Sequence, residues 1–182
     1  MKTDKKNYFK FTLGLVACLL VRLVPFRAPN VEPILATTMP FSKAYGAVSG
    51  FSFAVLSILL YDMITGTIGL QTIFTASAYG VLGLASALYF KNKKGSAWEY
   101  ARFAVAGTIF YDAVTGLTVG PIFFHQSFLN SLIGQIPFTM LHLLGNVTLA
   151  LVLSPAIYGL LVRKKKRETQ ATLINNLNPK II

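Results

Sequence analysis

Long apolar stretches separated by short polar breaks dominate the chain. Read as helices, these stretches cover residues 8–25, 31–41, 44–64, 68–90, 98–117 and 128–162. Most of them approach or exceed the roughly 20 residues that a helix needs to cross about 30 Å of hydrocarbon. The pattern predicts an all-α membrane protein with a single transmembrane domain over residues 1–162. Residues 163–182 are polar and basic, and we expect a cytoplasmic tail that is disordered or lies on the membrane surface.

The stretch 31–41 is the shortest of the predicted helices, since its length gives only about 16 Å at 1.5 Å per residue. Pro33 suits the first turn of a helix, and Pro40 disfavours continuation through it. We therefore expect a short, tilted or partly re-entrant helix, although the segment could also continue into 44–64. Gly46 and Gly50 then form a small-xxx-small pair, which favours close packing against another helix.

Composition and charge support the membrane assignment and orient the chain. Charged residues make up 13% of the sequence and the mean hydropathy is +0.59, whereas soluble domains are about 25% charged. The net charge of +11 comes mainly from the two ends and from Lys91 to Lys94. Six spans place these basic groups and Lys43 on one side, as the positive-inside rule requires, and five spans do not. We expect six spans in the plasma membrane with both termini cytoplasmic, and no nucleic-acid binding, because no basic face with interleaved aromatic residues is present.

A seven-residue motif occurs twice, as Leu-Tyr-Asp-Met-Ile-Thr-Gly at 60–66 and Phe-Tyr-Asp-Ala-Val-Thr-Gly at 110–116. Both copies fall at the predicted outer ends of helices that run in the same direction, which indicates a parallel repeat. A carboxylate in the apolar layer is costly unless it is paired or hydrated. Asp62 and Asp112 therefore either contact a ligand or ion, or cap the following loop with Thr65 and Thr115.

Other polar side chains gather on the predicted outer side. Arg22 and Arg27 can pair with Glu32 and the two aspartates, or can bind a zwitterionic or polar aromatic molecule. A stripe on one face of 128–162 must look into protein or water, and it is as consistent with interhelical hydrogen bonds as with ligand contact. The stripe consists of Ser131, Gln135, Thr139, His142 and Asn146. Pro137 should kink this helix.

The order of these features resembles the substrate-binding (S) components of energy-coupling factor transporters. The residues are the loop Pro25-Phe26-Arg27-Ala28-Pro29-Asn30-Val31-Glu32-Pro33, then Gly46, Gly50 and Asp62, and the likeness covers about 21–162. The resemblance implies a six-helix bundle that captures a vitamin or similar micronutrient near its outer face. It also implies a transmembrane coupling protein and two ATPases as partners, and this sequence has no G-x-x-x-x-G-K-[ST] phosphate loop. The family often carries an Ala-x-x-x-Ala docking motif on its first helix, where this chain has Gly14-x-x-x-Cys18.

We therefore expect a substrate-binding membrane subunit rather than an enzyme, with the lipid bilayer as its surroundings and no cofactor or metal. Two alternatives remain. The first is a proton-coupled carrier that uses Asp62, Asp112 or His142, because a carboxyl group removed from water binds a proton more readily. The second is a membrane scaffold without a small ligand. The predicted substrate-binding residues are Arg27, Asn30, Glu32, Asp62, Thr65, Gln71, Asp112, Thr115, His125, Gln135 and His142.

Overall fold

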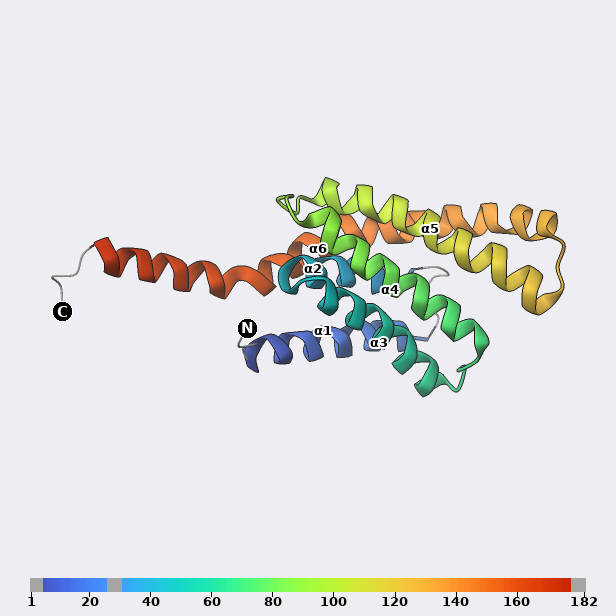
Figure 1. Ribbon diagram of the computed structural model, residues 1–182, viewed down its shortest axis with the longest axis horizontal. Coiled ribbons are helices and arrows are strands. Elements are labelled where there is room, and N and C mark those ends of the chain that lie inside the picture. Colours follow the sequence, from blue (N-terminus) through green and yellow to red (C-terminus); the bar gives the residue numbers. More distant parts are fainter. Residues whose placement is uncertain (1–4, 26–30, 178–182) are drawn as a thin grey trace.

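The computed structural model describes residues 5–25 and 31–177, and within these ranges it is helical with no strand. Its helices are α1 (Lys5–Leu23), α2 (Ile34–Tyr45), α3 (Ala47–Thr65), α4 (Leu70–Phe90), α5 (Ala97–Phe124) and α6 (Phe128–Leu177), as Figure 1 shows. Four segments of the described chain are long and apolar enough to cross a membrane. They are α3, α4, α5 and the part of α6 that ends at Val162. The expected all-α, multi-pass membrane architecture is confirmed at this level.

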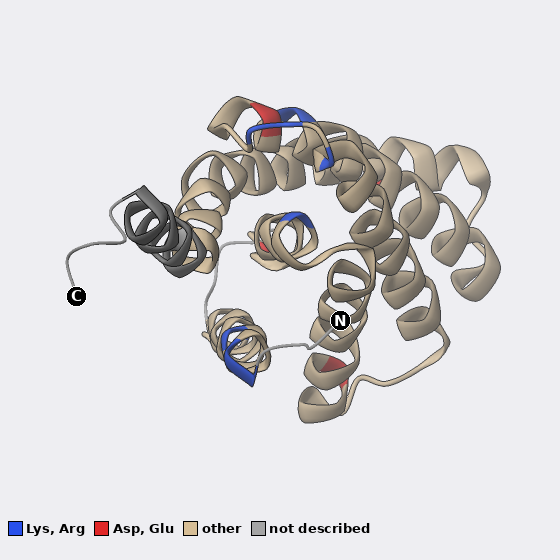
Figure 2. Ribbon diagram, turned by 60° about the vertical axis from the view of Figure 1, so that its left-hand side comes forward, with Lys and Arg blue, Asp and Glu red and all other residues tan. Residues whose placement is uncertain are grey.

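The short helix α2 lies at the centre of the bundle. It packs against α3, α4, α5 and α6, and also against α1, and Figure 2 shows it enclosed by the longer helices. Every residue from Ile34 to Ser42 is buried. A helix of 12 residues is too short to cross about 30 Å of hydrocarbon, but it is stable at membrane depth when protein surrounds it.

The predicted end of this helix at Phe41 is wrong, because α2 continues through Pro40 to Tyr45. A proline inside a helix leaves the carbonyl four residues earlier without its N–H donor. Here that carbonyl belongs to Ala36, and the hydroxyl of Ser154 in α6 donates to it at 2.7 Å. A side chain from another helix thus satisfies the acceptor that the proline leaves free.

Glycines decide how α2, α3 and α4 pack. A Cβ on Gly50 would lie 2.7 Å from the Gly83 carbonyl oxygen, so the backbones of α3 and α4 meet at this point. The Ser42 hydroxyl donates to the same Gly83 oxygen at 2.8 Å. Gly46 has a φ of 92° and open space around it, so it forms the turn between α2 and α3. Of the expected glycine pair, only Gly50 is a packing position.

The basic segments meet at one end of the bundle. The Lys10 ammonium donates to the Leu161 carbonyl at 2.7 Å, which joins the start of α1 to α6. The Lys43 ammonium at the end of α2 donates to the Phe90 and Lys93 carbonyls, and it lies 4.9 Å from the centre of the Tyr158 ring. The start of α1, the end of α2, the α4–α5 turn and this part of α6 therefore share one end.

Two predicted helix ends are corrected. The fifth helix does not stop at Leu117 but runs to Phe124, with Pro121 inside it. Gly116 and Gly120 do not break α5, because their missing side chains leave room for Gln135 and Ser131 of α6. The sixth helix does not stop at residue 162 either, and its backbone stays helical to Leu177.

Candidate functional site

A buried acid–base pair joins α5 to α6. Nδ1 of His142 lies 2.7 Å from Oδ1 of Asp112, and the two side chains are 3% and 1% exposed. One turn away, the Asn146 amide donates to the Thr108 hydroxyl at 2.9 Å. Asp112 and Thr108 are four residues apart on α5, as are His142 and Asn146 on α6, so each pair occupies one helix face. We call these four residues the polar quartet.

Several atoms in and around the polar quartet are buried without a hydrogen-bond partner among the described residues. They are Oδ2 of Asp112, Nε2 of His142, Oδ1 of Asn146 and the Tyr79 hydroxyl of α4. The Tyr79 ring lies 4.3 Å from the Tyr111 ring, centroid to centroid, and the Tyr111 ring meets the edge of the His142 ring at 5.7 Å. The unpartnered quartet atoms therefore lie between α5 and α6, and α4 approaches them through the contact of Tyr79 with Tyr111.

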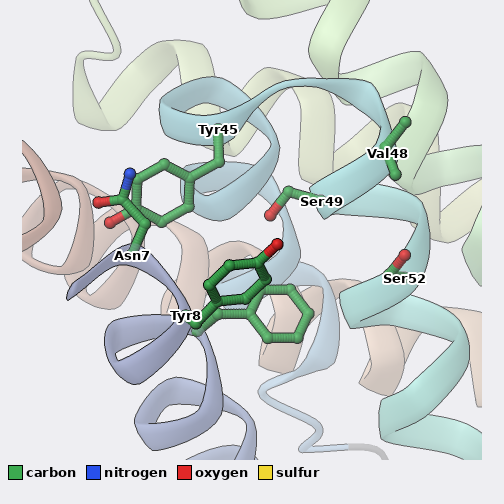
Figure 3. Close-up of a pocket in the computed structure, with 7 residues that line it drawn as sticks. Asn7, Tyr8, Tyr45, Val48, Ser49 and Ser52 are labelled. Atoms are coloured by element: carbon green, nitrogen blue, oxygen red, sulfur yellow. The ribbon is translucent and has the colours of Figure 1, made fainter. Parts of the chain in front are cut away.

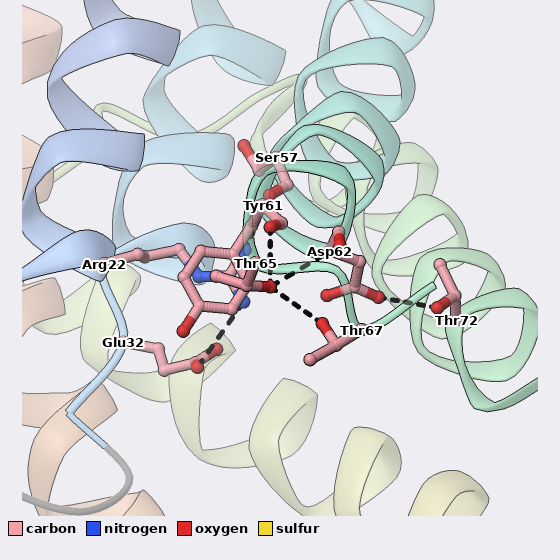
Figure 4. A network of polar contacts seen from close by, with 8 residues as sticks. All are labelled: Arg22, Glu32, Ser57, Tyr61, Asp62, Thr65, Thr67 and Thr72. Carbon is pink, nitrogen blue, oxygen red and sulfur yellow. Dashed lines mark hydrogen bonds and ion pairs between the residues drawn. The ribbon is translucent and has the colours of Figure 1, made fainter. Parts of the chain in front are cut away.

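A second polar cluster surrounds Arg22 at the other end of the bundle from the lysines. Its guanidinium carbon lies 3.8 Å from the Tyr61 ring centre, and its Nη1 donates to the Ser57 carbonyl at 2.6 Å. Its Nη2 lies 3.7 Å from Oε1 of Glu32. Figure 4 shows these groups converging from α1, from α3 and from the segment before α2. Pairing of the outer charges was one of the two interpretations, and Arg22 and Glu32 are paired in the structure.

The first copy of the repeated motif shapes the turn between α3 and α4. Oδ2 of Asp62 accepts a hydrogen bond of 2.7 Å from the Thr72 hydroxyl at the start of α4 (Figure 4). The Thr65 hydroxyl donates to the Tyr61 carbonyl at 2.9 Å. Gly66 closes α3 with a φ of 69°, a left-handed conformation that glycine adopts without strain. Asp62 and Thr65 thus have the loop-forming role that was one of the two interpretations.

The second copy does something different, because α5 continues past it. Asp112 lies near the middle of α5 rather than at its end, and it contacts α6. The Thr115 hydroxyl donates to the Tyr111 carbonyl at 2.8 Å within the helix. The expected placement of both motif copies at helix ends is therefore wrong for the second copy. Asp112 does not cap a loop.

The other predicted residues are spread over the bundle. Gln71 is exposed and its amide donates to the Thr67 carbonyl at 3.2 Å. Gln135 donates to Thr139 at 3.2 Å and packs on Gly116. His125 is exposed in the α5–α6 turn with a φ of 51°. It lies thirteen positions after Asp112, which is about 20 Å along a helix.

Arg27 and Asn30 lie outside the described residues. The sequence-based list of site residues also missed Thr108, a member of the polar quartet, and the neighbouring rings of Tyr79 and Tyr111. The position four residues before Asp112 was a usable signal for Thr108, since it shares that helix face. No local signal predicts the contact between Tyr79 and Tyr111, because the two rings come from different helices, α4 and α5.

A separate cavity of about 330 Å³ lies toward the basic end. It opens between α1, α2 and α3, as Figure 3 shows. The lining residues are Asn7, Tyr8, Phe11, Tyr45, Val48, Ser49 and Ser52. This cavity was not predicted from the sequence. Among the residues that the structure describes, no group of three or more His, Cys, Asp or Glu side chains is placed to hold a metal ion.

No protein-family model, curated protein or solved structure matches the chain.

Proposed function

We propose that the chain is a multi-pass protein of the plasma membrane that binds a small polar solute between α4, α5 and α6. Its role is that of the substrate-binding subunit of an ATP-driven importer, with a vitamin or similar micronutrient as the solute. The observation that carries the proposal is the buried Asp112–His142 pair with an unpartnered atom on each side chain. Ionisable groups inside a membrane bundle are functional sites by default.

The energetics of the polar quartet favour a ligand over simple helix packing. Interhelical pairing accounts for Oδ1 of Asp112 and for the amide nitrogen of Asn146. It leaves Oδ2 of Asp112 and Oδ1 of Asn146 buried and unpartnered. An unsatisfied buried group costs about 1–3 kcal/mol. A solute that donates to these acceptors removes that cost and so binds with a specific orientation.

The six-span orientation, in which α2 counts as a short span enclosed by protein, is part of the same proposal. The basic ends of α1, α2 and α6 and the α4–α5 turn lie together, and the positive-inside rule then favours a cytoplasmic position for all of them. The Arg22 cluster would face the outside. In this arrangement a solute approaches from the Arg22 end and passes Tyr61 and Glu32 before it reaches the polar quartet.

Docking onto a coupling protein would have to use residues other than Gly14 and Cys18. A Cβ on Gly14 would clash with the ring of Phe41, and the Thr37 hydroxyl donates to Sγ of Cys18, so both positions face α2. The face of α1 that points away from α2 carries the exposed side chains of Leu13, Val16 and Leu20. This face can meet either lipid or a partner helix.

Native mass spectrometry of the purified protein, followed by uptake measurements with the solute that co-purifies, tests the proposal. We expect uptake to require co-expressed coupling and ATPase subunits. We also expect uptake to persist when the proton gradient is collapsed and ATP is maintained. Uptake without the ATPase module would contradict the importer role.

A proton-coupled carrier is the second candidate, because the Asp112–His142 pair can hold and release a proton. Under that function, collapsing the proton gradient lowers uptake about tenfold even when ATP is maintained. A third outcome, in which no solute co-purifies and Asp112→Asn changes only stability or partner association, would indicate a scaffold.

A further inference from the structure

The protons on the Asp112–His142 pair determine what the site can bind. When Asp112 is ionised and the imidazole is neutral, Nδ1 must carry the proton that bonds to Oδ1 of Asp112. Nε2 is then a bare acceptor. In this state the pair has a net charge of −1. Adding one proton makes the pair neutral and turns Nε2 into an N–H donor. This holds whether the proton between the two side chains sits on Oδ1 of Asp112 or on Nδ1 of His142.

In the charged state the unpartnered atoms of the polar quartet are all acceptors. They are Oδ2 of Asp112, Nε2 of His142 and Oδ1 of Asn146, each buried without a donor among the described residues. The Tyr79 hydroxyl is also unpartnered and can accept or donate. An anionic or acceptor-rich solute would place further acceptors against these atoms, whereas an N–H donor would satisfy them.

Aromatic rings around the pair add a preference for shape. Phe138 and Tyr111 each meet the His142 ring edge-on, with centroids 5.7 Å apart. Tyr79 lies against Tyr111 at 4.3 Å. Ring faces attract cations, and they pack well on flat conjugated groups. A buried negative charge in an apolar bundle also needs a positive partner.

We propose that the ligand is a small, flat organic cation with at least two N–H donors, such as an amidinium or a protonated aminoheterocycle, and that it replaces a proton on the Asp112–His142 pair. This inference rests on the proposed function, because it names the solute class of the same site. It also predicts competition between protons and the ligand.

The other charged groups near the site, Arg22, Glu32 and Asp62, already have partners in the structure. Tyr79 and Tyr111 lie within electrostatic reach of Arg22, Glu32 and Asp112, and Tyr111 also within reach of Asp62. These groups come from α1, the segment before α2, and α3 to α5. Arg22 pairs with Glu32, and Asp62 accepts from Thr72. We therefore assign the proton that competes with the ligand to the Asp112–His142 pair.

The test uses probes that share one ring and differ in the head group. Thermal unfolding of the full-length protein in detergent is followed with benzamidinium, benzoate and benzyl alcohol, since a ligand that binds the folded state raises the melting temperature. We expect benzamidinium alone to raise it. Because protons compete for the same pair, we also expect the apparent affinity for benzamidinium, obtained from the concentration dependence, to rise with pH.

Two variants locate the effect. Asp112→Asn should weaken benzamidinium binding at least tenfold, whereas Asp62→Asn, the matched change in the first motif copy, should leave it unchanged. If Asp112→Asn does not fold, His142→Gln serves instead, and the pH dependence should disappear. The inference would be overturned if benzoate raised the melting temperature as much as benzamidinium, or if no probe raised it. It would also be overturned if Asp112→Asn and His142→Gln both left the affinity for benzamidinium unchanged.

These outcomes separate the ligand class from the proposed function. If benzamidinium binds as described but uptake proves independent of an ATPase module, the importer role fails and the ligand class stands. If an anionic solute co-purifies and its uptake requires the ATPase module, the ligand class fails and the importer role stands.

Discussion

Replacing Ser154 by alanine tests how a proline is accommodated in the central helix. The Ser154 hydroxyl, which is fully buried, donates to the Ala36 carbonyl at 2.7 Å, and Pro40 has no N–H for that acceptor. An unsatisfied buried acceptor costs about 1–3 kcal/mol. Hydrogen bonds between membrane helices average about 0.6 kcal/mol and reach about 1.7 kcal/mol. We expect Ser154→Ala to lower the free energy of unfolding by about 1–2 kcal/mol.

The decisive comparison is a double-mutant cycle with Pro40→Ala. Alanine at this position restores an N–H to the Ala36 carbonyl, so Ser154→Ala should cost less than about 0.5 kcal/mol in that background. The cycle removes the separate effect of losing the buried proline ring. Unfolding by SDS in mixed micelles measures all four proteins, and the exposed Ser77→Ala is the control, with an expected change within about 0.5 kcal/mol. An equal cost of Ser154→Ala in both backgrounds would refute the reasoning.

Two further substitutions test the packing of the bundle. Gly50→Ala places a Cβ 2.7 Å from the α4 backbone, and unfolding in the same assay should show a loss of about 1–3 kcal/mol. Gly134→Ala meets open space and should be neutral or stabilising by up to about 1 kcal/mol, so equal effects at the two sites would contradict the assigned contact. Arg22→Lys loses the stacking on Tyr61 and should cost about 1–2 kcal/mol. The exposed Arg102→Lys should change stability by less than about 0.5 kcal/mol, and a comparable loss there would count against the Arg22 cluster.

Hydrophobic patterning located the helices well, but it misplaced the ends that depend on tertiary contacts. Pro40 disfavours a helix locally, and the hydroxyl that compensates for it comes from Ser154, more than 100 residues later. Gly116 resembles Gly66, which does end a helix. The difference is that Gln135 fills the space beside Gly116 and α5 continues. Neither partner can be read from the local sequence.

The candidate site was predicted in parts rather than as a unit. The spacing of polar residues on α6 identified the face that carries His142 and Asn146, and the cost of a membrane carboxylate identified Asp112. The sequence could not pair them, because the pairing depends on how far α5 extends and on its antiparallel register with α6. The repeated motif suggested equal roles for Asp62 and Asp112, and their different neighbours give them different ones.

The most direct test of the central claim is to measure binding of the co-purified solute to the wild type, Asp112→Asn and Asp62→Asn. The two variants make the same chemical change in the two copies of one motif. A solute site at the Asp112–His142 pair predicts at least a tenfold loss of affinity in Asp112→Asn and no change in Asp62→Asn. Unchanged affinity in Asp112→Asn, or equal losses in both variants, would contradict the account.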